Sequence, residues 1–133
     1  MIIPGGQSTL PASDSFSLAN TVKLANASAP TSNPFVGYPL LERISACEST
    51  GNPNGTPRQF LADGAVLWGN DPTTGKPIKR DLGILQINTY VWGSLAVKMG
   101  DDLYTEAGNV NFGEWLFNTY GSSPWNASRG CWG

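Results

Sequence analysis

The sequence predicts an α+β fold: a mostly helical domain with a small antiparallel hairpin sheet. Apolar residues recur at helical spacing before residue 51 and again after residue 89. Between these stretches, Asp63-Gly64 separates two short apolar runs, which is typical of a hairpin. At 133 residues, 40% of them hydrophobic, the chain is long enough for one domain with a proper core.

The N-terminal quarter of the chain differs in composition from the rest. Residues 1–35 are rich in Ser, Ala, Thr, Pro and Asn, and their only charged side chains are Asp14 and Lys23. This composition predicts a linker or tether, followed by a folded domain over residues 36–133. No stretch has the length of a membrane span, and the first residues lack the features of a signal peptide. If the protein is exported, we expect its signal or anchor to lie outside this sequence.

The first predicted helix begins near Leu40 and ends at Gly51. Its apolar residues recur at steps of three and four, so they share one face. Pro39 suits the first helical turn, and Gly51 suits the position just past the last one.

Glu48 is the first candidate for chemistry. It falls in the final turn of this helix, beside Cys47, where the helix dipole disfavours a negative charge. A half-buried carboxyl in that place should have a raised pKa, and a carboxyl that stays protonated near neutral pH can act as a general acid. The alternative is a solvated glutamate in a fraying turn.

After the first helix we expect a loop over residues 50–58 and a hairpin over 59–68. A polar loop over 69–80 follows, and residues 81–99 begin as a strand and continue as a helix. Asp101 or Asp102 is suited to cap the next helix, 103–120. Two apolar sides on that helix predict that it is central and buried. Gly121 then ends it, and a tail rich in tryptophan follows.

Charge and composition exclude several classes of function. The net charge of −2 argues against nucleic acid as a partner and against electrostatic capture by anionic membranes. The chain has no histidine, which removes Ser-His triads and histidine zinc sites. Its two cysteines are too few for a structural zinc site, and we expect no metal. They form either two reduced thiols or one bridge.

Three segments resemble the lysozyme-like superfamily, in the same order along the chain. Residues 47–53 (CESTGNP) are similar to the catalytic-glutamate segment of soluble lytic transglycosylases and of resuscitation-promoting factors. Residues 81–88 (DLGILQIN) resemble the D-Y-G-I-L-Q-I-N strand of animal lysozymes. Residues 108–110 (GNV) and 120–121 (YG) resemble the last core helix of the transglycosylases. The resemblance covers residues 39–132 and implies a lysozyme-like domain.

This resemblance implies a peptidoglycan-cleaving glycosidase, a muramidase that cuts the β-1,4 bond between N-acetylmuramic acid and N-acetylglucosamine. Glu48 would protonate the glycosidic oxygen, and Asp81 would support the oxocarbenium-like transition state. Asp81 has a structural alternative, which is to cap backbone amides or to pair with Arg80. The resemblance also implies four residues that contact the substrate: Gln86, Asn88, Trp92 and Tyr120. Trp92 fits a core position of its helix equally well.

Two chemistries compete within this hypothesis. A hydrolase would use Asp81 and let water attack the sugar, whereas a lytic transglycosylase needs only Glu48 and leaves 1,6-anhydromuramic acid ends. The carboxylate at Asp81 favours hydrolysis, although 33 residues separate it from Glu48, more than in animal lysozymes. A non-catalytic glycan-binding module of the same fold and an interaction domain of a larger assembly are also compatible with the sequence. We expect the partner to be a glycan strand, with no cofactor and no membrane contact, and the protein to be an exported monomer.

The two cysteines are predicted to form a disulfide. An even number of cysteines in a small chain rich in Trp and Gly is typical of an exported protein with one bridge. Cys47 borders Glu48 and Cys131 lies at the end of the chain. A bridge between them would hold the C-terminal tail under the helix that carries Glu48.

Overall fold

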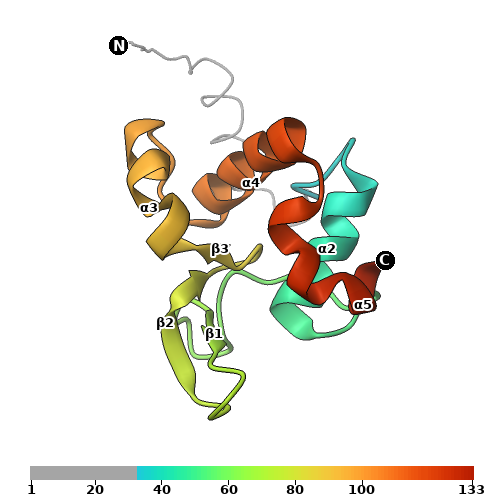
Figure 1. Cartoon of the computed structure of the whole chain (residues 1–133), viewed down its shortest axis with the longest axis vertical. Coiled ribbons are helices and arrows are strands. Elements are labelled where there is room, and N and C mark those ends of the chain that lie inside the picture. Colours follow the sequence, from blue (N-terminus) through green and yellow to red (C-terminus); the bar gives the residue numbers. More distant parts are fainter. Residues whose placement is uncertain (1–32) are drawn as a thin grey trace. The chain divides into compact units, whose positions relative to one another are not determined.

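The structure, a computed structural model, describes residues 33–133. Within them, helices and a three-stranded antiparallel sheet form an α+β fold, which confirms the predicted fold class (Figure 1). The elements follow in chain order as α2 (Pro39–Thr50), β1 (Trp68–Asn70), β2 (Pro77–Leu82), β3 (Ile87–Asn88), α3 (Thr89–Lys98), α4 (Glu106–Tyr120), the 3-10 helix η2 (Ser123–Ser128) and α5 (Arg129–Trp132).

The compact unit that carries these elements covers Pro34–Gly133. Its first residues pack inward, because the Phe35 side chain is buried in the apolar core. Most of the predicted linker, residues 1–32, lies outside the described residues, so its assignment as a linker stays a prediction. In the described part of the chain, no helix has both the length and the apolar character needed to cross a membrane.

Helix α2 has the ends that the sequence predicts. Pro39 occupies its first position, and Gly51 follows it in the left-handed conformation with φ 75°. The Gly51 amide donates to the Cys47 carbonyl, which closes the last turn. The apolar side of the helix packs into the core, and η2 and α5 lie against it (Figure 1). Glu48 is therefore fixed at a well-defined helix end rather than in a fraying turn.

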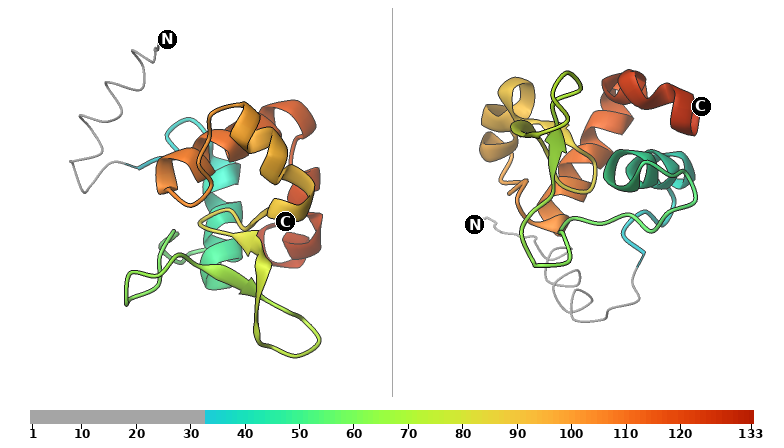
Figure 2. Two further views of the ribbon diagram at one scale, coloured as in Figure 1. Left: turned by 90° about the vertical axis from the view of Figure 1, so that its left-hand side faces the viewer. Right: turned by 90° about the horizontal axis from the view of Figure 1, so that it is seen from below.

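The sheet is larger than the sequence indicates. The predicted 59–68 hairpin is reduced to a single bridge between Phe60 and Val66, and Trp68–Asn70 pairs with β2 instead. The prediction of a polar loop over residues 69–80 is wrong, because both of its ends belong to strands β1 and β2. Exposure does alternate at the start of β2, where Pro77 and Lys79 are exposed and residues 78 and 80 are partly buried. The sequence does not show this alternation, because one of the partly buried residues is the charged Arg80. Figure 2 shows the β1–β2 hairpin reaching beyond the helices.

Helix α4 is central, as predicted, but it begins later than predicted. Its N-cap is Thr105, whose hydroxyl accepts a hydrogen bond from the Gly108 amide. Asp102 instead closes the preceding turn by accepting from the Tyr104 amide. That turn lies against the helix so closely that a Cβ on Gly108 would sit 2.0 Å from the Asp102 carbonyl oxygen. Asp102 therefore serves the turn before α4.

Two buried amide side chains support the turn between β2 and β3. Asn109 donates to the Leu82 carbonyl and accepts from the Leu85 amide. Gln59 accepts from the Ile84 amide and donates to the carbonyls of residues 103 and 104. Neither side chain is more than 1% exposed. Because buried polar groups are costly when unpaired, these bonds fix one backbone path for the turn. That turn joins the two strands that carry Asp81 and Asn88.

Candidate active site

Glu48 faces a pocket of about 240 Å³ between α2, the sheet and the C-terminal segment. The side chain comes from the last turn of α2 and is half-buried. The residues that line this pocket with it are Arg80, Asp81, Gln86, Ile87, Asn88, Trp92, Leu116, Pro124, Trp125 and Ala127. The pocket therefore holds five of the six predicted site residues, all but Tyr120.

The environment of Glu48 alters its acidity. Burial raises the pKa of Glu48 from 4.5 to about 7, because the charged form loses contact with water. A hydrogen bond from Ser128 works against this rise, and the negative charge of Asp81 adds to it. A large share of the Glu48 carboxyl groups thus carries a proton near neutral pH.

Asp81 lies on β2 beside the same pocket. Its Oδ2 accepts two hydrogen bonds from the neighbouring Arg80, at 3.2 Å from Nε and 3.1 Å from Nη2. The pair is partly exposed, with 25% of the Asp81 side chain accessible. The predicted pairing with Arg80 is therefore present, and it leaves the second oxygen, Oδ1, for other contacts.

Gln86 and Asn88 line the pocket, and each side chain is held by hydrogen bonds to the backbone. Gln86 has φ 50° and donates from Nε2 to the Gly83 carbonyl at 2.9 Å. Its Oε1 lies over Gly69, where a Cβ would approach that oxygen to 2.4 Å, so a larger residue at position 69 would displace the Gln86 side chain. Asn88 caps α3, because its Oδ1 accepts from the amides of residues 90 and 91. The oxygen of Asn88 is thus engaged by the helix, and its Nδ2 is the atom suited to a ligand.

Trp92 lines the pocket, whereas Tyr120 does not. Trp92 lines the pocket and also packs against Phe112 and Tyr120, with ring centroids 6.2 Å and 5.7 Å away. Tyr120 is half exposed and contacts Trp92 and Trp115. It supports the Trp92 indole from outside the pocket.

A second pocket, of about 380 Å³, meets the first at the two carboxylates. Glu48, Asp81 and Gln86 line both pockets. Arg58 and Trp68 also line the second pocket. The Arg58 Nε donates to the Ser49 carbonyl, which anchors this cation beside the end of α2. The two hollows therefore share the wall that carries both carboxyl groups, and together they are called the cleft here.

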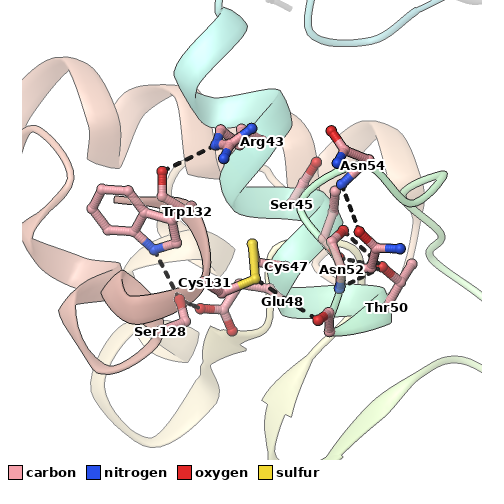
Figure 3. The surroundings of a disulfide bond; sticks show 12 residues. Arg43, Ser45, Cys47, Glu48, Thr50, Asn52, Asn54, Ser128, Cys131 and Trp132 are labelled. Atoms are coloured by element: carbon pink, nitrogen blue, oxygen red, sulfur yellow. Dashed lines mark hydrogen bonds between the residues drawn. A yellow bond between two sulfur atoms is a disulfide. The ribbon is translucent and has the colours of Figure 1, made fainter.

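The C-terminal segment supplies a residue that the sequence motifs do not indicate. The Ser128 hydroxyl donates to Glu48 Oε2 and accepts from Trp132 Nε1 at 2.9 Å (Figure 3). The predicted disulfide between Cys47 and Cys131 is confirmed, and it joins α5 to α2 directly beside Glu48. Because the bridge was predicted, the position of Ser128 three residues before Cys131 was the signal that could have placed its hydroxyl near the acid.

Comparisons of this chain with protein-family models, with curated proteins and with solved structures find no match.

Proposed function

We propose that this protein is a peptidoglycan-cleaving glycosidase of the lysozyme type, with Glu48 as its general acid. The observation that carries this proposal is the Glu48 carboxyl, which opens on a cleft and has its pKa raised to about 7. A group with that pKa is suited to donate a proton at neutral pH. The Asp81 carboxylate lines the same cleft, and two carboxyl groups flanking one bond are the arrangement that glycoside hydrolysis uses.

The chemistry follows from the two carboxyl groups. The Glu48 proton passes to the glycosidic oxygen while the bond between that oxygen and the sugar C1 breaks, and the electron pair stays with the leaving sugar. Positive charge then develops at C1, where the Asp81 carboxylate can stabilise it. Water adds to C1 and gives a proton back to Glu48, which restores the acid. This cycle needs no cofactor.

The cleft walls support a carbohydrate substrate. The Trp92 side chain offers an apolar surface for a sugar ring, and the Gln86 and Asn88 amides offer hydrogen bonds to hydroxyl and acetamido groups. The second pocket shares Glu48 and Asp81 with the first, so the two hollows offer room for more than one sugar next to both carboxyl groups. Peptidoglycan strands carry carboxylates, for which Arg58 in the second pocket is a suitable partner.

An exported location belongs to this proposal. The Cys47–Cys131 disulfide is typical of proteins that work in oxidising compartments, and the cell wall lies outside the cytosol.

A non-catalytic glycan-binding module is the weaker alternative. Such a module gains nothing from a half-buried acid with a raised pKa beside a second carboxylate, because holding them together lowers the stability of the fold near neutral pH.

Digestion of purified peptidoglycan, followed by mass analysis of the fragments, tests the proposal. We expect fragments with reducing muramic acid ends, as hydrolysis gives. A lytic transglycosylase is the second candidate, because Glu48 could carry both proton transfers alone. Its fragments would be lighter by one water and would have no reducing end. An absence of new fragments would contradict both chemistries.

Asp81→Asn separates the two chemistries further. If Asp81 stabilises charge at C1, we expect kcat to fall by about 10- to 100-fold, because a charge-stabilising group is lost from the transition state. Asp63→Asn is the matched control, since Asp63 lies in an exposed turn and its Oδ1 accepts from the Ala65 amide. Equal rates for the two variants would contradict a catalytic role for Asp81 and favour transglycosylation.

A further inference from the structure

The Ser128 hydroxyl stands between the acid and two tryptophans. Its Oγ contacts Glu48 Oε2, the Trp132 Nε1 at 2.9 Å and the Trp125 carbonyl oxygen at 3.1 Å. The Trp132 indole N–H can only donate, so Ser128 must accept from it. The single hydroxyl proton of Ser128 can then go to Glu48 or to the Trp125 carbonyl.

Two features favour the bond to Glu48. When Glu48 is ionised, a hydrogen bond to its carboxylate is stronger than one to a neutral carbonyl. The Trp125 carbonyl also has a second donor, because Trp132 Nε1 lies 3.3 Å from it. The chain of donors therefore runs in one direction, from Trp132 through Ser128 to Glu48, and each bond polarises the next.

The scaffold around this chain restricts its motion. Cys131, next to Trp132, is bonded to Cys47, next to Glu48 (Figure 3). The Trp132 carbonyl accepts from Arg43 Nε at 3.1 Å, which adds a second tie between α5 and α2. Trp132 itself is 7% exposed. The donor chain is therefore fastened to the same helix that carries the acid.

We propose that Ser128 is a positioning residue that binds Glu48 Oε2 and thereby directs the transferable proton to Oε1, the oxygen that Ser128 does not contact. This inference rests on the proposed role of Glu48 as the acid. When Oε2 accepts from Ser128, the proton of the neutral carboxyl is left to Oε1. After the proton has moved to the glycosidic oxygen, the same bond from Ser128 becomes charge-assisted and stabilises the carboxylate. Ser128 thus contributes most after proton transfer has begun.

Several charged groups face Glu48, and they stay unchanged when Ser128 is replaced. Asp81 and Arg80 come from β2, and Arg58 comes from the loop after α2. The residues of η2 that line the pocket, Pro124, Trp125 and Ala127, carry no charge. A change in the titration of Glu48 in a Ser128 variant therefore reports the loss of this hydrogen bond.

Ser128→Ala tests the proposal in two independent ways. We expect the pKa of Glu48, measured by carbon NMR of its carboxyl group, to rise, because the bond from Ser128 lowers it. We expect kcat for peptidoglycan to fall about tenfold with KM nearly unchanged, since a bond that strengthens in the transition state is lost. Ser128→Thr keeps a hydroxyl and should restore much of both values.

Ser123→Ala is the matched control, because the Ser123 hydroxyl on the same 3-10 helix bonds to the Tyr120 carbonyl instead. Its kcat and the pKa of Glu48 should equal those of the wild type. An unchanged pKa of Glu48 in Ser128→Ala would overturn the proposal, and so would a fall in kcat that Ser128→Thr does not restore. Absence of cleavage by the wild type would instead contradict the proposed function, and the NMR titration would still decide whether Ser128 bonds to Glu48.

Discussion

Glu48→Gln should remove cell-wall cleavage while leaving the fold intact. The glutamine side chain keeps the size of the acid and can still accept the hydrogen bond from Ser128. Its amide has no acidic proton to transfer to the glycosidic oxygen. Loss of a general acid lowers the rate by about 10²- to 10⁴-fold. The measurement is the clearing rate of a peptidoglycan suspension by the purified proteins near pH 6.

The control for this variant is Glu42→Gln, in the first turn of the same helix. It makes the same change of charge outside the residues that line the two pockets, so its rate should match the wild type. If Glu48→Gln clears the suspension as fast as Glu42→Gln, then Glu48 is not the acid.

Folding of the Gln variant can be checked through the pH dependence of stability. The pKa of Glu48 is higher in the folded chain than in the unfolded one, so the folded state holds this proton more tightly. Its contribution to stability is present below about pH 4.5 and is lost as the pH rises through about 7. Glu48→Gln lacks this loss and should be at least as stable as the wild type above neutral pH.

Removal of the disulfide should have the largest effect on stability. The Cys47–Cys131 bridge closes a loop with a sequence separation of 84 residues. On the loop-entropy model, replacing both cysteines with alanine should lower the free energy of unfolding by about 4–5 kcal/mol. For a domain of this size, the Tm should then fall by on the order of 20 °C. Calorimetry or circular dichroism measures the change.

Reductant supplies the control for this experiment. It should lower the Tm of the wild type toward that of the double alanine variant and should leave the variant itself unchanged. A double variant that unfolds within a few degrees of the wild type would show that the remaining contacts of α5, such as the bond from Arg43 to Trp132, hold it in place alone.

Local signals in the sequence account for the parts of the fold that were predicted. Pro39 and Gly51 mark the ends of α2 because each suits a backbone conformation that the helix end requires. The position of Glu48 beside the buried Cys47 follows from those ends. The disulfide could be predicted because the chain has only two cysteines, and the helical pattern of residues 103–120 identified α4 as central.

The parts that could not be predicted depend on contacts between distant residues. Ser128 meets a partner 80 positions away, and the only local sign of this contact is its place three residues before Cys131, whose predicted bridge leads to Cys47 beside Glu48. Gln59 and Asn109 pair with backbone groups of the β2–β3 turn, which no periodicity predicts. The first four residues of strand β2, 77–80, were missed because charged residues hide the alternation that identifies a strand.

The most direct test compares the pH dependence of peptidoglycan cleavage with the titration of the Glu48 carboxyl in the same protein. If Glu48 is the acid, kcat/KM should fall as the pH rises through about 7, and carbon NMR should place the pKa of Glu48 at the same midpoint. A Glu48 carboxyl that titrates near its usual 4.5, or cleavage that continues undiminished well above the pKa of Glu48, would contradict its role as the general acid.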